Sequence, residues 1–175
     1  RYNMPNVIRI ACLMAIIGIT PAYALDHIKA SIPEAKLVGK GRMSVMFWDV
    51  YDAVLYAPGG TWKAGSPLAL SLTYLRDLEG RAIADRSAEE IRKLGFTDEI
   101  RLAAWHSQMR RIFPDVTDGT TLTGIYNAQG ESIFYHHGAE VGRITDPEFG
   151  RHFFNIWLDP RTSAPELRAQ LLGLQ

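Results

Sequence analysis

Arg42 and Tyr51 are the two side chains whose types and spacing best fit a binding site. An arginine keeps its proton, so one that is partly buried must be matched by an anion or by several acceptors. A guanidinium fork beside a phenol hydroxyl would clamp a carboxylate or an enolate oxygen. Both residues fall in a predicted hairpin, where a cross-strand or diagonal pair would point toward a layer of helices. We therefore predict that Arg42 and Tyr51 bind a ligand, with Arg42 the best candidate for a catalytic group.

A structural role for Arg42 is the alternative. The same arginine would pair with Asp49, with Asp52 or with a helix carboxylate, and structural ion pairs of this kind are common. From spacing alone this alternative is the stronger of the two.

Other catalytic signatures are absent from the sequence. It has no Gly-x-Ser-x-Gly elbow and no phosphate-binding glycine loop, and its one cysteine is Cys12. The five histidines do not show metal-ligand spacing. We therefore predict neither a metal nor a cofactor, and the sequence identifies no catalytic residue beyond the candidate Arg42.

Alternating apolar residues predict strands before and after a helical middle. The segment 68–75 alternates most clearly, because Leu68, Leu70, Leu72 and Tyr74 share one face. A hairpin over 37–47 and 49–57 precedes it. Three further strands are expected at 120–126, 132–136 and 140–144.

Capping residues predict four helices. Ser87 and Glu90 fit a capping box whose helix should stop at Gly95, and a second helix should run from Thr97 to Pro114. The remaining two should start at Asp146, followed by proline, and at Ser163. Strands, helices, strands and helices in this order predict an α+β fold, an antiparallel sheet with helices packed over one face.

Aromatic residues are plentiful for a domain of this size. They include four tryptophans and the pair Phe153-Phe154. Aromatic side chains dominate core energetics, and they also form the walls of apolar ligand pockets. Both interpretations can hold together.

The first 24 residues predict a cleavable signal peptide. A positive region from Arg1 to Arg9 precedes an apolar run, and Ala22-Tyr23-Ala24 fits a signal peptidase site. The apolar run is too short to span a bilayer. We expect cleavage after Ala24, which divides the chain into a signal peptide at 1–24 and one domain at 25–175.

The mature chain would be nearly neutral and free of cysteine. Two of the 19 basic residues and none of the 19 acidic ones lie before residue 25, which leaves 17 bases against 19 acids. This balance argues against a nucleic-acid partner. No second apolar stretch approaches membrane-spanning length, so we expect no transmembrane segment in the mature chain and no disulfide in its core.

The mature chain also resembles the chalcone isomerase-like family, as a bacterial exported member, which implies a periplasmic location. The resemblance rests on five segments in order: 37–42, 47–56, 70–77, 142–149 and 154–160. The fold it implies is an open-faced β-sandwich, a large antiparallel sheet with helices layered on one face.

The resemblance has implications for site residues. Plant chalcone isomerases close a hydroxychalcone into a flavanone, and related plastid proteins bind fatty acids through an arginine and a tyrosine. Arg42 matches the arginine of both branches, whereas Tyr51 stands where the isomerases have a threonine. The isomerase tyrosine and asparagine fall around Ile83 and Glu90, and neither is kept in type. A substrate-selecting residue falls near Thr145 or Asp146 and is not assigned.

Three functions follow, in order of preference. The first is periplasmic binding of a fatty-acid-like or other apolar carboxylate ligand through Arg42 and Tyr51. The second is a non-catalytic envelope interaction protein. The third is an isomerase, an intramolecular lyase, acting on a chalcone-like enone or phenol, with Arg42 stabilising the developing anion.

Overall fold

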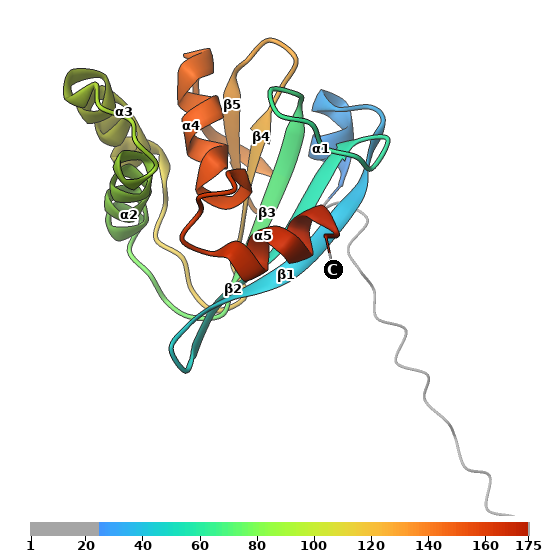
Figure 1. Ribbon diagram of the computed structural model, residues 1–175, viewed down its shortest axis with the longest axis horizontal. Helices are drawn as coiled ribbons and strands as arrows, with labels where there is room; N and C mark the ends of the chain where they lie inside the picture. Colours follow the sequence, from blue (N-terminus) through green and yellow to red (C-terminus); the bar gives the residue numbers. More distant parts are fainter. Residues whose placement is uncertain (1–24, 175) are drawn as a thin grey trace, which may run out of the picture.

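Six strands form one antiparallel sheet in chain order. The computed structural model describes residues 25–174, and the predicted signal peptide lies outside them. The strands are β1 Ala35–Val45, β2 Trp48–Pro58, β3 Leu68–Tyr74, β4 Thr121–Tyr126, β5 Ser132–His136 and β6 Ala139–Ile144. The helices are α1 Asp26–Ser31, α2 Gly80–Lys93, α3 Glu99–Ile112, α4 Pro147–Leu158 and α5 Pro165–Leu172. Helices α2 to α5 lie on one side of the sheet, which confirms the predicted α+β architecture (Figure 1).

The main core lies between the sheet and this helical layer. The predicted face of β3 is confirmed, since Leu68, Leu70, Leu72 and Tyr74 are all buried in it. The apolar faces of α3 and α4 meet them, and Trp105 and Phe149 are among the largest fully buried side chains. Burying such aromatic surface is the main source of stability in a domain without disulfides.

Helix α1 packs against the other face of the sheet, a placement that the sequence analysis does not predict. Ile28 and Ile32 form a second, smaller cluster with Ala69 and Ile125. Further along the same face, hydroxyl pairs replace apolar contacts, with Ser71 and Thr123 joined at 2.9 Å. This face is therefore apolar under α1 and polar toward the end of the sheet where β1 and β2 turn.

Two glycines let α5 approach β1 closely. A Cβ atom at Gly39 would collide with the backbone carbonyls of Gln170 and Leu171, and one at Gly41 would collide with the Gln170 side chain. Both glycines therefore face the helical layer, as does Met43 two residues further on. Register shifts between Leu37 and Gly39 and again after Met43 mark irregularities in the hairpin, which accounts for its imperfect alternation.

Helix α2 corrects one capping prediction. It begins at Gly80, whose N–H donates to the Asp115 carboxylate at 2.8 Å, seven residues before the expected start. Ser87 is therefore inside the helix, where its hydroxyl donates to the Ile83 carbonyl. The expected stop is confirmed, because Gly95 follows the helix with a φ of 103°.

Of the other predicted helix starts, some are confirmed and one is wrong. The predicted cap at Asp146 is confirmed, since its carboxylate accepts the Glu148 N–H, and the helix expected from Thr97 begins at Glu99 with Asp98 as its cap. The predicted cap at Ser163 is wrong, because Ala164 occupies the N-cap of α5 and the Ser163 hydroxyl donates to Glu90 instead. A tertiary partner outcompeted the local one.

Candidate functional site

A cavity of about 340 Å³ lies between the sheet and the helical layer. Strands β1 to β5, helices α2 and α4 and the segment before α5 contribute its walls. The walls are mainly apolar, with Leu72, Ile83, Phe153 and Ile156 among them. Ligand pockets in proteins are typically concave and mostly apolar with a few placed polar groups, and this cavity has that composition.

A cross-strand pair of phenols, Tyr51 and Tyr74, lines the cavity. The two residues are directly opposite one another on β2 and β3, with ring centroids 5.7 Å apart in an edge-on arrangement. Burial raises the pKa of Tyr51 to about 12 and holds the pKa of Tyr74 well above the ordinary phenol value. Both therefore stay protonated and remain hydrogen-bond donors at neutral pH.

The Tyr51 hydroxyl is held from one side. The indole N–H of Trp157 on α4 donates to it at 2.9 Å, which uses one lone pair of the oxygen. A hydroxyl group has one hydrogen to donate. Among the described residues, no acceptor is found for the hydroxyl hydrogen of Tyr51 or for the hydroxyl hydrogen of Tyr74. Each of the two phenols can therefore donate one hydrogen bond to an acceptor placed in the cavity.

A second polar group on the cavity wall joins α2 to the segment before α5. The Glu90 carboxylate is almost fully buried, at 5 % exposure. It accepts from the Ser163 hydroxyl at 2.6 Å and pairs with Arg86 of α2, also at 2.6 Å. Sequence analysis assigns Glu90 to a cap and does not identify Arg86. Because α2 begins at Gly80, Glu90 lies within the helix and on its buried side. A glutamate on the apolar side of a helix is the signal in the sequence that would have identified this group.

The predicted clamp of Arg42 and Tyr51 is not formed, and this geometric expectation is corrected. Arg42 is in register with Asp52 and Met43 is in register with Tyr51, so Arg42 and Tyr51 face opposite sides of the sheet. The guanidinium pairs with Asp52 at 2.6 Å and with Asp49 at 3.0 Å, half exposed and outside the cavity. The ion pair weighed as the alternative is therefore the observed arrangement.

Two positions named by the family resemblance do line the cavity. Ile83 and Glu90, which stand where the isomerases have a tyrosine and an asparagine, are both wall residues. An isoleucine has no hydrogen-bonding group, so at this position the wall lacks the polar side chain that the resemblance implies for the isomerases.

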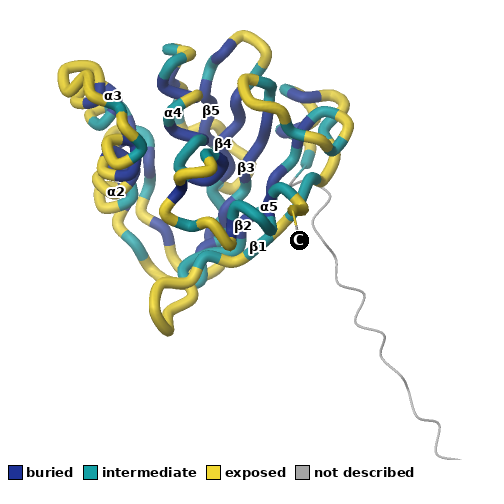
Figure 2. The backbone as a smooth tube through the Cα atoms, in the orientation of Figure 1, coloured by how far each residue is buried: buried dark blue, intermediate teal, exposed yellow. Residues whose placement is uncertain are grey.

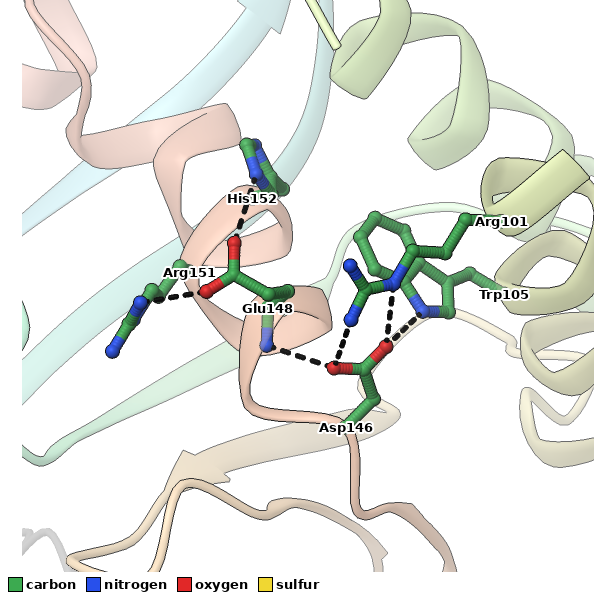
Figure 3. Close-up of polar contacts among 6 residues, drawn as sticks. All are labelled: Arg101, Trp105, Asp146, Glu148, Arg151 and His152. Atoms are coloured by element: carbon green, nitrogen blue, oxygen red, sulfur yellow. Dashed lines mark hydrogen bonds and ion pairs between the residues drawn. The ribbon is translucent and has the colours of Figure 1, made fainter. Parts of the chain in front are cut away.

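The region expected to contain a substrate-selecting residue serves as a joint between α3 and α4. Figure 3 shows the Asp146 carboxylate accepting from the Arg101 guanidinium and from the Trp105 indole at 3.0 Å. It also caps α4 through the Glu148 N–H. Neither Thr145 nor Asp146 lines the cavity.

Residues 25–174 show neither a cluster of potential metal ligands nor a helix suited to cross a membrane. Within residues 25–174, histidine, cysteine, aspartate and glutamate side chains do not gather in threes as a metal site requires. None of the helices in this range is both long and apolar enough to span a bilayer. From its lining residues, the cavity supplies an apolar volume with neutral donors, and a cation and a carboxylate lie at its wall.

Comparisons with known proteins agree with this architecture. The sequence model described as chalcone isomerase-like matches residues 22–173. An uncharacterized protein of Haemophilus influenzae is 30 % identical over 125 residues, which are 71 % of this chain and 61 % of that protein. The crystal structure of a fatty-acid binding protein of Arabidopsis thaliana superposes with a TM-score of 0.60 at 15 % identity, over 79 % of this chain and 87 % of that one. The chain thus spans less than two thirds of its curated relative, and the structural likeness concerns the fold.

Proposed function

Because the chain belongs to the chalcone isomerase-like family, we propose that its cavity binds a fatty-acid-like molecule or another apolar carboxylate ligand. The observation that carries this proposal is the phenol pair of Tyr51 and Tyr74 at the wall of an otherwise apolar cavity. The two free O–H groups would donate to the ligand carboxylate while the apolar walls enclose its chain. The fatty-acid binding title of the structural neighbour supports the same ligand class.

Arg86 supplies the positive charge in this proposal. Arg86 lines the cavity with its side chain 61 % exposed, and its guanidinium pairs at 2.6 Å with the Glu90 carboxylate, which the Lys93 amine also approaches at 3.6 Å. An incoming carboxylate would share the guanidinium with Glu90. In this proposal Tyr51 keeps the binding role predicted from the sequence, whereas Arg42 has none, because it lies outside the cavity.

The volume favours a short or medium chain. At about 340 Å³ the cavity is near the lower end of the 300–1,000 Å³ that is typical of ligand pockets. We expect octanoate and dodecanoate to fit better than palmitate. The proposed setting is the periplasm, which amino-terminal sequencing of the exported protein would test by showing whether it begins at Leu25.

Calorimetric titration in detergent-free buffer tests the binding proposal. We expect dodecanoate to bind more tightly than dodecanol, because the alcohol lacks the charged oxygens that accept from the phenols. Tyr51→Phe should weaken dodecanoate by about tenfold or more, since a hydrogen bond to a charged group is worth about 1.5–3 kcal/mol. Native mass spectrometry of the freshly purified protein would show whether it already carries a fatty acid.

Arg42→Gln is the matched control, because it removes a guanidinium that is outside the cavity. We expect it to leave dodecanoate affinity unchanged. If no fatty acid binds and the purified protein is empty, the proposal fails. It fails equally if Arg42→Gln abolishes binding while Tyr51→Phe does not, because the ligand would then contact the opposite face of the sheet.

A further inference from the structure

The turn between β1 and β2 carries four large apolar side chains in solvent. Val45, Met46, Phe47 and Trp48, which we term the hairpin tip, are 50, 86, 95 and 66 % exposed. The tip projects beyond the rest of the molecule in Figure 1, and it is coloured as exposed in Figure 2. Four adjacent exposed apolar residues on one protruding turn differ from the isolated exposed leucine or isoleucine of an ordinary surface.

Turn chemistry does not explain these residues. Val45 pairs directly with Trp48, so Met46 and Phe47 form a two-residue loop. Met46 has a φ of 56°, a conformation in which glycine or asparagine is the favourable residue. The sequence therefore accepts backbone strain as well as apolar exposure at this turn.

The apolar surface of the tip continues into the cavity. Val45 is a half-exposed residue of the tip and also lines the cavity. Met43 on β1 and Val50 on β2 extend this lining along the two strands. A molecule moving along this surface would pass from the tip to the cavity wall over apolar side chains.

A polar collar begins immediately behind the tip. Ser44 donates to Asp49 at 2.6 Å, and Arg42 pairs with Asp49 and Asp52. Arg76, in the segment that follows β3, has its guanidinium carbon 5.5 Å from the centre of the Trp48 ring. Apolar residues at the end, a tryptophan with a cation over its ring and a charged collar match the order of layers from acyl chains to headgroups.

We propose that the hairpin tip inserts into the interfacial layer of a lipid bilayer. Interfacial helices bury their apolar face about 5–10 Å into the boundary between headgroups and acyl chains, and we expect a similar depth for the tip. A stable protein interface needs about 800 Å² from each partner, which a protruding four-residue turn does not supply. This docking is argued from the hairpin tip alone. A docked tip would also let an apolar ligand move from the membrane into the cavity, and that part of the inference rests on the proposed function.

Flotation with phosphatidylcholine vesicles tests this inference. We expect the wild-type protein to float with the vesicles and Phe47→Ser to lower the partition coefficient on the order of tenfold, the effect of losing one buried aromatic side chain. Ile100→Ser is the matched control, because Ile100 is 87 % exposed on α3, away from the hairpin. It should float as the wild type does.

Three results would overturn the inference. These are a wild-type protein that stays in solution, a Phe47→Ser variant that floats unchanged, and binding of both proteins only when anionic phosphatidylglycerol is added. Sedimentation without vesicles covers the remaining alternative, since self-association lost in Phe47→Ser would make the tip a contact between copies of this chain.

Octanoate titration without vesicles separates this inference from the proposed function. Phe47→Ser should bind octanoate as the wild type does, because Phe47 does not line the cavity. Intact octanoate binding with no flotation overturns the docking alone. Flotation without octanoate binding overturns the proposed ligand and leaves the docking in place.

Discussion

The indole N–H of Trp157 donates to the Tyr51 hydroxyl at 2.9 Å, across 106 residues of sequence. This hydrogen bond joins α4 to β2 at the cavity wall. It fixes the phenol oxygen as an acceptor toward the helix, so that the hydroxyl hydrogen is directed elsewhere. The bond is therefore both a structural tie and the reason that Tyr51 can serve as a donor to a ligand.

Removing this hydroxyl should destabilise the protein measurably. Tyr51→Phe leaves the Trp157 N–H without its acceptor, and an unsatisfied partly buried donor costs about 1–3 kcal/mol. We expect a loss of that size in the free energy of unfolding in urea. Tyr56→Phe is the control on the other face of the same strand, where no hydrogen bond to the hydroxyl is found among the described residues, and it should change the free energy little. Equal effects of the two substitutions would contradict the assignment.

Neutralising Glu90 should tighten carboxylate binding. Glu90 holds Arg86 at 2.6 Å and is the carboxylate with which a ligand must share that guanidinium. Glu90→Gln keeps an acceptor for Ser163 while it removes the competing charge. We expect dodecanoate affinity to rise several-fold in calorimetry, with dodecanol unaffected. Glu89→Gln is the control, because Glu89 is exposed and its contact with the Arg86 guanidinium is longer, at 3.9 Å, and therefore weaker. Weaker dodecanoate binding in Glu90→Gln would show that Glu90 supports the ligand.

Asp146 should make stability depend on pH in acid. Burial acts to raise the pKa of Asp146, but hydrogen bonds from Trp105, the Glu148 N–H and Arg101 outweigh it and lower the pKa below the ordinary 3.8. A lowered folded-state pKa stabilises the protein above the unfolded value, and that contribution disappears as the pH falls through the folded value.

The matching measurement is urea unfolding of Asp146→Asn across a pH series. At pH 7 we expect a loss of about 1–2 kcal/mol, because the amide oxygen of asparagine can still cap α4 but no longer offers Arg101 and Trp105 a charged acceptor. The difference from the wild type should shrink below pH 3.8 and then vanish. Asp118→Asn is the control, since no side-chain partner of Asp118 is found among the described residues. A difference in unfolding free energy that persists in strong acid would show that the substitution acts through side-chain packing rather than through the lost charge.

Gly39 should not tolerate a side chain. Its Cβ position is occupied by the backbone of α5, so Gly39→Ala must displace the helix from β1. Overpacking of this kind typically costs about 1–3 kcal/mol. We expect a lower urea midpoint together with amide shift changes over residues 165–172. Lys40→Ala, which changes the neighbouring outward position, should leave both unchanged. An unchanged midpoint in Gly39→Ala would mean that α5 does not approach β1 this closely.

Local chemistry explains which elements could be predicted. The cap at Asp146 and the stop at Gly95 depend on contacts within one helix turn, and both are present. The caps expected at Ser87 and Ser163 fail because each serine found another partner. Ser87 bonds within its own helix, and Ser163 bonds to Glu90, which is 73 residues away in sequence.

The sequence by itself determined the hairpin, the antiparallel character of the sheet and the alternation of faces, because strand periodicity is a property of neighbouring residues. Only the tertiary structure decided which face is covered. Gly39 and Gly41 carry no side chain to mark an inner face, and their closeness to α5 is what turns them inward and Arg42 outward. The arginine therefore pairs with Asp49 and Asp52, and Tyr51 and Tyr74, whose pairing depends on the register of two strands, line the cavity instead.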